Sequence, residues 1–265
     1  MGMPDFQAKD VTADEVVEAL QRHGCCALRS IVPLQWLDLI RQRVEVEYEN
    51  MDDLFEQGKM TEEAYRHCYR YGILRPFEND YQLQDGQWMS HVMLNCISQT
   101  LLKDVYCRFF DDSELNMLIP SSHVRRVRPE GAVPFHQDSS VMRLNQTVIV
   151  NSWFPLDIAG TTAPSIEAYP QAQTSCWPCG ENRDGSLYGH LQISETQIAQ
   201  NIPDVPLWSP ILYPGDVFLL QSYTVHRTHI RDDMRDSRRD FELRFARRSV
   251  LETRTDINQK PINFA

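Results

Sequence analysis

The sequence lacks the long hydrophobic runs that carry a chain into or across a membrane. No stretch of about eighteen apolar residues occurs. Residues 1–10 are polar and acidic and have no apolar segment of the kind found in secretory signals. Phe6 occupies the position at which an N-myristoylation motif requires Ser or Thr. These absences predict a cytoplasmic protein without a membrane partner.

Positive charge is also scarce. The 265 residues include 26 Lys and Arg against 37 Asp and Glu, which gives a formal net charge of −11. Nucleic acids and anionic membranes bind basic surfaces, so neither is an expected partner, and a small-molecule ligand is favoured. The seven cysteines are scattered and odd in number, and without a secretory signal we interpret them as reduced thiols. No pattern in the sequence specifies an oligomeric state.

The first third of the chain has helical periodicity. Residues 12–15 (Thr-Ala-Asp-Glu) form a capping-box pattern, and Gly24 is a typical helix stop. Pro33 occupies the position in a helix where proline is favoured, the first. The expected elements are helices over 12–24, 33–50, 61–71 and 90–102, with a strand over 25–32.

From residue 105 onward, short apolar or alternating runs recur between turn residues, which is typical of strands. They span residues 105–110, 115–119, 124–127, 147–155, 164–168, 187–193, 217–221 and 241–251. With no internal repeat or linker, we expect one domain over residues 1–265. Its fold class would be mainly β with helices (α+β): a double-stranded β-helix (jelly roll, cupin-like) over 105–251, with the mostly helical residues 1–104 packed on it.

His136 and Asp138 form the most informative short motif. On an extended strand, residues two apart point to the same face, so an imidazole and a carboxylate there reach one point in space. Alone this pair is weak evidence, because a chain of this composition produces one by chance about as often as not. A strand histidine beside a merely polar neighbour explains it equally well.

His226 is the candidate for a third ligand. It lies just past an apolar strand, residues 217–220, which follows a Tyr-Pro-Gly-Asp turn at 213–216. In a closed double-stranded β-helix, strands distant in sequence become neighbours in space. Two imidazoles and one carboxylate would form the facial triad of non-haem Fe(II) oxygenases. His229 ranks second, because its odd offset from His226 points it to the opposite face.

Two arginines follow on the next expected strand. Arg238 or Arg239 could point into the barrel, where a planar guanidinium binds a carboxylate bidentately. The alternative is that both are solvated charges beside Asp236 and Asp240.

Together these residues resemble the phytanoyl-CoA dioxygenase-like family of Fe(II)/2-oxoglutarate-dependent oxygenases. The resemblance covers most of the chain and is densest over residues 134–245. The motifs that carry it are Pro-Phe-His-Gln-Asp at 134–138, the strand with Trp153, Pro-Gly-Asp-Val at 214–217, His226 and Arg238. The chain departs from the family after His226, where Arg-Thr-His replaces the common Gly-Ser-Gly, and at residues 166–169, where Ile-Glu-Ala-Tyr replaces Gly-Ser-His. The second departure borders the substrate region and favours an unusual substrate.

The resemblance implies roles for individual residues. His136, Asp138 and His226 would ligate Fe(II). Arg238 would bind the distal carboxylate of the cosubstrate 2-oxoglutarate, helped by the hydroxyl of Thr228. Trp153 would form a wall of the cosubstrate pocket.

The resemblance also implies the reaction. With O₂ as second cosubstrate, the expected activity is hydroxylation of an unactivated C–H in a small molecule, a biosynthetic or secondary metabolite. Asp138 supplies the carboxylate that halogenating relatives replace with a small residue, which favours hydroxylation. Desaturation, cyclisation or epoxidation at the same iron centre is the alternative outcome.

Other features of the sequence have more than one functional interpretation. Arg126, with Arg125 and Arg128, is a candidate for binding an anionic group of the substrate or cosubstrate, and pairing with surface acids is an equal alternative. Cys176 and Cys179 form a Cys-x-x-Cys in a loop-like context, so a surface loop is favoured over a thiol oxidoreductase site. A non-catalytic jelly-roll protein with a residual metal site is the remaining alternative.

Overall fold

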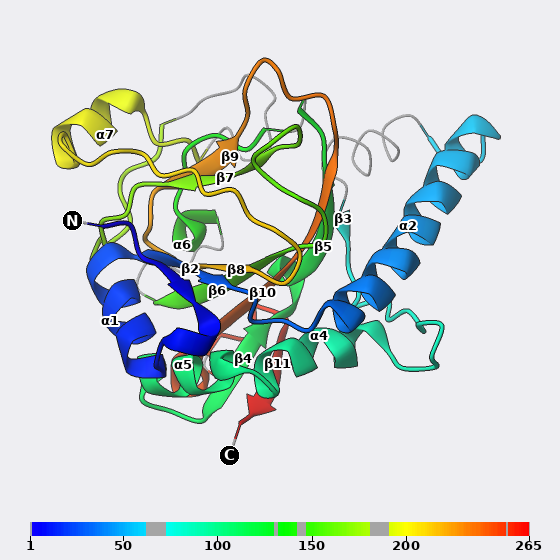
Figure 1. Cartoon of the computed structure of the whole chain (residues 1–265), viewed down its shortest axis with the longest axis horizontal. Coiled ribbons are helices and arrows are strands. Elements are labelled where there is room, and N and C mark those ends of the chain that lie inside the picture. The colour runs from blue at the N-terminus through cyan, green and yellow to red at the C-terminus, as the bar shows by residue number, and fades with distance from the viewer. Residues whose placement is uncertain are drawn as a thin grey trace.

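A nine-stranded sheet forms the centre of the described chain (Figure 1). The computed structural model describes residues 2–61, 73–129, 132–141, 147–180, 191–252 and 254–264. The strands along the main path are, in spatial order, β1 (Asp5–Gln7), β2 (Cys25–Arg29), β8 (Val217–Gln221), β6 (Ile149–Pro155), β10 (Arg238–Arg247), β4 (Glu114–Leu118) and β11 (Gln259–Asn263). Beside β4, β10 also pairs with β5 (His123–Val127), which in turn pairs with β3 (Ile73–Leu74).

A second, two-stranded sheet pairs β7 (Ser165–Ala168) with β9 (His226–His229). It lies across from the large sheet, and residues of β7 and β9 line a cavity together with residues of β5, β6 and β10 (Figure 1). The cavity therefore lies between the two sheets.

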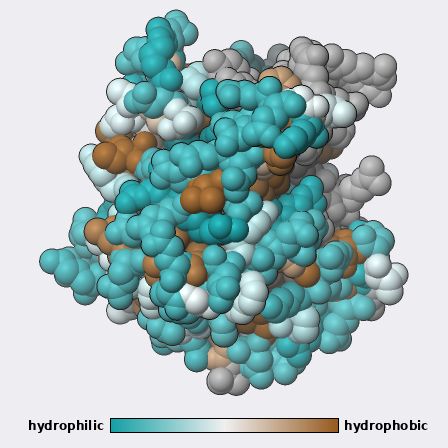
Figure 2. Space-filling view, turned by 90° about the vertical axis from the view of Figure 1, so that its right-hand side faces the viewer, coloured by the Kyte–Doolittle hydropathy of each residue, from teal (hydrophilic) through white to brown (hydrophobic). Residues whose placement is uncertain are grey.

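Helices cover the other face of the large sheet. The covering helices belong to the N-terminal part of the chain: α1 (Ala13–His23), α2 (Leu34–Glu56), α4 (Met89–Ser98) and α5 (Leu101–Phe110). The shorter helical elements elsewhere are the 3₁₀ helices η1 (Ala8–Asp10) and η2 (Ile119–Ser121), and α6 (Asp138–Val141), α7 (Glu195–Asn201) and α8 (Arg248–Leu251). Buried side chains of α1 and α5, such as Leu20 and Tyr106, form one core with the β10 residues Phe241, Leu243 and Phe245. The face in Figure 2 is mostly hydrophilic, with apolar atoms in small separate groups, because the apolar side chains gather in this core.

The helix-start and helix-stop signals are confirmed. Thr12 and Glu15 form both bonds of a capping box at the start of α1, and Gly24 ends it with a φ of 73°. Helix α2 continues past the expected end at Asn50 to Glu56. The expected helix over 61–71 falls almost wholly outside the described residues, as does most of the expected strand at 187–193.

One predicted strand is wrong. Residues 105–110 belong to helix α5, in which Val105, Tyr106 and Phe110 are buried at helical spacing. Strand β2 confirms the strand expected over 25–32, although it ends at Arg29, and β1 is a further strand of the N-terminal third that the sequence did not predict. Among the described residues, no helix combines the length and apolar character needed to cross a bilayer.

Candidate metal centre and adjoining cavity

The structure brings His136, Asp138 and His226 together. The backbones of His136 and His226 exchange two hydrogen bonds of 3.0 and 3.1 Å. The Oδ1 atom of Asp138 lies 3.8 Å from Nε2 of His136 and 3.9 Å from Nε2 of His226. All three side chains are buried, and their candidate ligand atoms lie within 4.8 Å of one another. Asp138 begins helix α6 rather than continuing a strand, so the i, i+2 argument found the pair but not the conformation that positions it.

Each imidazole, in its neutral form, presents the lone pair of Nε2 to the shared point. His136 Nδ1 lies 2.8 Å from the carbonyl of Pro134, and His226 Nδ1 lies 2.9 Å from the carbonyl of Thr224. A carbonyl only accepts, so in each neutral ring the proton resides on Nδ1 and the lone pair on Nε2. Burial lowers the pKa of His136 to about 3, which keeps that ring neutral. Two neutral imidazoles and one carboxylate are the donor set of a 2-His-1-carboxylate Fe(II) site.

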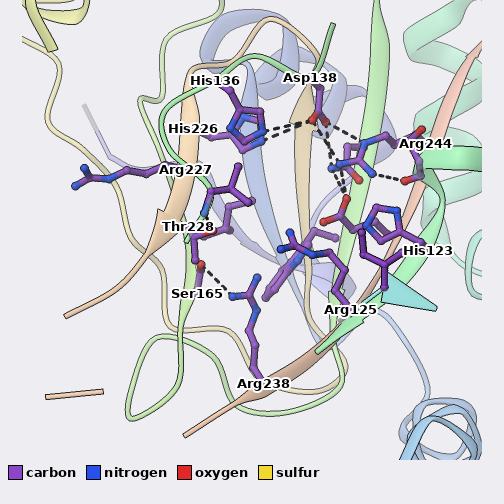
Figure 3. Close-up of a pocket in the computed structure, with 17 residues that line it drawn as sticks. His123, Arg125, His136, Asp138, Ser165, His226, Arg227, Thr228, Arg238 and Arg244 are labelled. Carbon is purple, nitrogen blue, oxygen red and sulfur yellow. Dashed lines mark hydrogen bonds and ion pairs between the residues drawn. The ribbon is translucent and has the colours of Figure 1, made fainter. Parts of the chain in front are cut away.

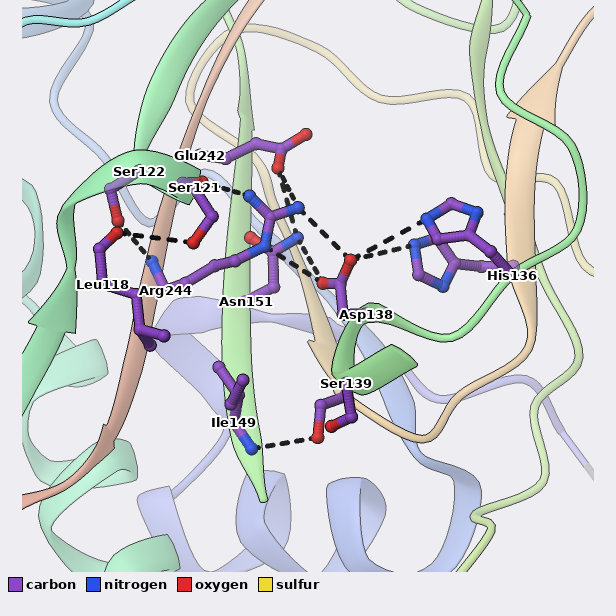
Figure 4. Close-up of polar contacts among 12 residues, drawn as sticks. Leu118, Ser121, Ser122, His136, Asp138, Ser139, Ile149, Asn151, Glu242 and Arg244 are labelled. Carbon is purple, nitrogen blue, oxygen red and sulfur yellow. Dashed lines mark hydrogen bonds and ion pairs between the residues drawn. The ribbon is translucent and has the colours of Figure 1, made fainter. Parts of the chain in front are cut away.

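Arg244 and Asn151 form hydrogen bonds with the Oδ2 atom of Asp138 (Figure 4). This oxygen accepts from Arg244 Nε at 3.1 Å and from Asn151 Nδ2 at 3.3 Å. Arg244 also pairs with Glu242, and all these side chains are buried. Burial raises the pKa of Asp138, but Arg244 and the two histidines outweigh it, so its pKa lies below the ordinary value. Arg244 Nη2 also donates to Oδ1, at 3.4 Å. Oδ1 is the oxygen that faces the two histidines, so the geometry favours Oδ1 as a monodentate metal ligand while Arg244 Nε and Asn151 hold Oδ2.

Side chains of strand β10 alternate between its two faces, which places Glu242 and Arg244 in the cavity. Phe241, Leu243 and Phe245 belong to the helix-covered core. On the other face, Arg238, Glu242 and Arg244 line the cavity that contains the candidate metal cluster, which is the set of side chains of His136, Asp138 and His226. Sequence reasoning missed Glu242 and Arg244, although the alternating pattern Phe-Glu-Leu-Arg-Phe over 241–245 carried the signal.

The guanidinium of Arg238 lies inside the cavity and is 2 % exposed (Figure 3). Its Nε donates to Asp240 Oδ2 at 3.0 Å, and its Nη1 donates to the carbonyl of Ser165 at 3.3 Å. Its Cζ atom lies over the Trp153 ring, 4.8 Å from the ring centre. Thr228 also lines the cavity, and its hydroxyl accepts from the backbone N–H of Val133. Arg238, Trp153 and Thr228, named from the sequence, thus lie around one space.

Arg239 points to the opposite side of β10. It forms hydrogen bonds of 2.8 Å with Asp157 and pairs with Glu45 at 3.5 Å. Of the two arginines left open by the sequence, only Arg238 lines the cavity with the metal cluster.

Arg126 also lies away from the metal cluster. It pairs with Asp52 at 2.8 and 2.9 Å and stacks 4.5 Å from the centre of the Tyr48 ring, beside a separate hollow. Its neighbour Arg125 lines the metal cavity instead, together with His123. Alternation along β5 places Arg125 and Arg126 beside different hollows, and a role of Arg126 in substrate binding stays a prediction.

The remaining candidates lie beside the site. His229 Nδ1 contacts Glu167 Oε2 at 2.6 Å, which draws its ring away from the metal cluster. Gln137, between two of the candidate ligands, donates to the carbonyl of Ser175 and accepts from the N–H of Trp177, so the segment with Cys176 packs next to the site. Burial raises the pKa of Cys176, which is the opposite of an activated thiol.

The N-terminal region reaches the site through Thr224. The Thr224 hydroxyl donates to the carbonyl of Gly24 at 2.6 Å, and the carbonyl of Thr224 orients His226. A Cβ placed on Gly24 would lie 2.4 Å from Thr224 Oγ1. The glycine therefore provides both the left-handed helix end and the space for this contact.

Comparison with known proteins connects this geometry to solved structures. No family model and no curated protein matches the sequence. The carbocyclase SnoK from nogalamycin biosynthesis, a non-haem α-ketoglutarate-dependent enzyme, superposes with a TM-score of 0.56 at 12 % identity, covering 93 % of this chain and 88 % of SnoK. The non-haem α-ketoglutarate-dependent epimerase SnoN of the same pathway has a TM-score of 0.52 at 10 % identity, covering 89 % of this chain and 80 % of SnoN. AviO1 from Streptomyces viridochromogenes Tue57 has a TM-score of 0.52 at 17 % identity, covering 88 % of this chain and 94 % of AviO1. At these identities the likeness establishes the fold, and the chain shares it with two enzymes described as non-haem and α-ketoglutarate-dependent.

Proposed function

We propose that the protein is an Fe(II)/2-oxoglutarate-dependent dioxygenase that acts on a small molecule. One observation carries the proposal: two neutral imidazoles and one carboxylate converge from residues 136, 138 and 226, in a cavity that also holds a buried guanidinium. The names of the structural neighbours SnoK and SnoN support the same class.

The proposal includes the architecture. We interpret the two sheets that enclose the cavity as a double-stranded β-helix, with residues 1–265 forming a single domain. His136 pairs with His226 at the start of β9 through a backbone bridge, and Asp138 follows at the start of helix α6, so segments distant in sequence meet in that barrel.

Each residue has a defined task in this proposal. His136, Asp138 Oδ1 and His226 hold Fe(II) on one face, and Arg244 with Asn151 fixes the orientation of Asp138. Arg238 binds the distal carboxylate of 2-oxoglutarate.

Other groups shape the space around the cosubstrate. The Trp153 ring supports the Arg238 guanidinium, and Thr228 borders the same space. When bound, Fe(II), 2-oxoglutarate and O₂ supply an oxidant strong enough to remove hydrogen from an unactivated C–H. The protein excludes bulk water and places one C–H of the substrate beside that oxidant.

Hydroxylation is the outcome we propose, because Asp138 occupies the position that a halide needs in halogenating enzymes. SnoK is described as a carbocyclase and SnoN as an epimerase, so cyclisation or another oxidation on this fold is the alternative outcome. We propose a biosynthetic or secondary metabolite as substrate and the cytoplasm as location; a direct role of Arg126 in substrate binding stays a prediction.

Oxygen consumption tests the proposal. Purified protein supplied with Fe(II) and 2-oxoglutarate should convert 2-oxoglutarate to succinate, slowly without substrate and faster with a suitable one. A non-catalytic binding protein with a residual metal site would bind Fe(II) and produce no succinate above that of the His136→Ala variant.

A further inference from the structure

Asp240 is an unexpected buried carboxylate directly beside Arg238, the proposed cosubstrate anchor. It is fully buried, and its Oδ2 accepts from Nε of Arg238 at 3.0 Å. Its other oxygen, Oδ1, is buried without a hydrogen-bond partner among the described residues. The guanidinium that would hold the distal carboxylate of 2-oxoglutarate is therefore already shared with a carboxylate of the protein.

The charged and titratable groups around Asp240 come from three strands. Arg238 and Glu242 are its neighbours on the same face of β10, Arg125 of β5 is its partner in the antiparallel register, and Trp153 of β6 stacks against Arg238. Burial, helped by the nearby charge of Glu242, raises the pKa of Asp240 to about 6, against the lowering effects of Arg238, Arg125 and the Trp153 indole. At neutral pH this carboxyl can therefore gain a proton at small cost.

We propose that Asp240 sets the affinity for the dicarboxylate cosubstrate, because 2-oxoglutarate binds with Asp240 in its neutral, protonated form. This inference rests on the proposed function and specifies the regulation of the same site. When the distal carboxylate of 2-oxoglutarate joins Arg238, two carboxylates share one guanidinium in a buried space, and like charges there disfavour double ionisation. A proton from solvent on Oδ1 removes the conflict and leaves the bond from Arg238 Nε to Oδ2 in place.

The pKa of about 6 sets an upper limit on how much Asp240 can weaken 2-oxoglutarate binding. Protonating a group with a pKa of about 6 reduces the apparent affinity by at most a factor of 1 + 10^(pH − 6), which is about twofold at pH 6, about tenfold at pH 7 and about 100-fold at pH 8. Succinate, the dicarboxylate product, would meet the same opposition, which favours its release. Asp240 is thus a specificity-determining residue that discriminates by the distal carboxylate.

Binding of two 2-oxoacids to the anaerobic, Fe(II)-loaded protein tests the inference. The probes are 2-oxoglutarate and 2-oxopentanoate, which has the same chain length and chelating end but a methyl group in place of the distal carboxylate. Affinity is followed by the visible absorption of the Fe(II)–2-oxoacid chelate from pH 6 to pH 8, and proton uptake by calorimetry in two buffers of different ionisation enthalpy. Asp240→Asn removes the charge and keeps an acceptor for Arg238, and Asp256→Asn is the control that removes a surface carboxylate paired with Arg254.

The expected result is specific to the dicarboxylate. Asp240→Asn should bind 2-oxoglutarate about tenfold more tightly than wild type at pH 7 and should lose the pH dependence, with no change for 2-oxopentanoate. Wild type should take up as much as one proton per 2-oxoglutarate and none with 2-oxopentanoate; because this measurement needs no variant, it stands even if Asp240→Asn folds poorly. Asp256→Asn should match wild type throughout.

Other results overturn the inference in distinguishable ways. Weaker 2-oxoglutarate binding by Asp240→Asn, or wild-type binding without proton uptake, means that Asp240 only positions Arg238. If wild type binds both 2-oxoacids with equal affinity at every pH, Arg238 does not anchor the distal carboxylate and Asp240 does not set the affinity. Failure of wild type to form a chelate with either 2-oxoacid refutes the proposed function itself.

Discussion

Replacing Arg244 with Met removes the guanidinium that contacts both Asp138 and Glu242. Both carboxylates are buried, at 2 % and 5 % exposure, and Asp138 would keep the weaker contact to the Asn151 amide. Removing one partner of a buried ion pair typically costs about 3–5 kcal/mol, because it leaves an uncompensated charge. We expect the free energy of unfolding of the metal-free variant to fall by about this amount.

A divalent ion should reverse part of that loss. Deleting a group that orients a metal ligand usually weakens metal binding about 10–100-fold, or about 1.4–2.7 kcal/mol. The charge left on Glu242 acts in the opposite direction: at an effective dielectric constant of about 20, a carboxylate attracts a divalent ion a few ångströms away by several kcal/mol. The attraction is larger, so Arg244→Met should bind Mn(II), a redox-stable substitute for Fe(II), more tightly than wild type.

Urea unfolding with a chelator and with saturating Mn(II) measures both effects. The stability difference between wild type and Arg244→Met should be smaller in Mn(II) by about 1 kcal/mol or more. Arg239→Met is the matched control on the opposite face of β10; its partially exposed pairs with Asp157 and Glu45 should be worth about 1 kcal/mol or less, equally in both conditions. An identical cost for Arg244→Met with and without Mn(II) would refute the reasoning, as would weaker Mn(II) binding.

Three further outcomes follow from the site. His136→Ala should abolish succinate formation and Mn(II) binding while circular dichroism stays unchanged; turnover at the wild-type rate would remove His136 from the ligand set. Arg238→Met should raise the KM for 2-oxoglutarate at least about tenfold, since it removes a charge-assisted bidentate contact, and Arg239→Met should not, so an equal rise in both variants would contradict the assignment of Arg238. Replacing both Cys176 and Cys179 with Ser should retain activity in the oxygen-uptake assay, and complete loss would revive a thiol-based reaction.

The three candidate metal ligands could be predicted from the sequence because a site of this kind requires particular residue types. A histidine and an aspartate two apart, a distant histidine after a turn and a strand, and an arginine further on form a pattern that few other sites need. The structure brings His136, Asp138 and His226 together as expected and selects Arg238 over Arg239 for the cavity.

The errors arose where tertiary contacts override local pattern. Residues 105–110 are apolar enough for a strand, but their buried face has helical spacing and packs on the large sheet. The sequence also does not state which of Arg125 and Arg126 faces the cavity with the candidate ligands; Arg125 lines that cavity, and Arg126 lines the second hollow. Asp240 was considered part of a solvated charge group, and Arg244 was not singled out, since a buried ion pair is recognisable only when both partners are seen.

The contact between Gly24 and Thr224 bears on how this polypeptide could be shortened or recombined. The orientation of an imidazole near the C-terminal end depends, through one hydroxyl and one carbonyl, on a glycine within the first two dozen residues. A fragment that begins at residue 105 would keep every proposed ligand of the ion and yet lose the group on which the Thr224 hydroxyl rests, along with strand β2, which borders β8. Chimeras with other barrels of this kind should therefore exchange both ends of the chain together.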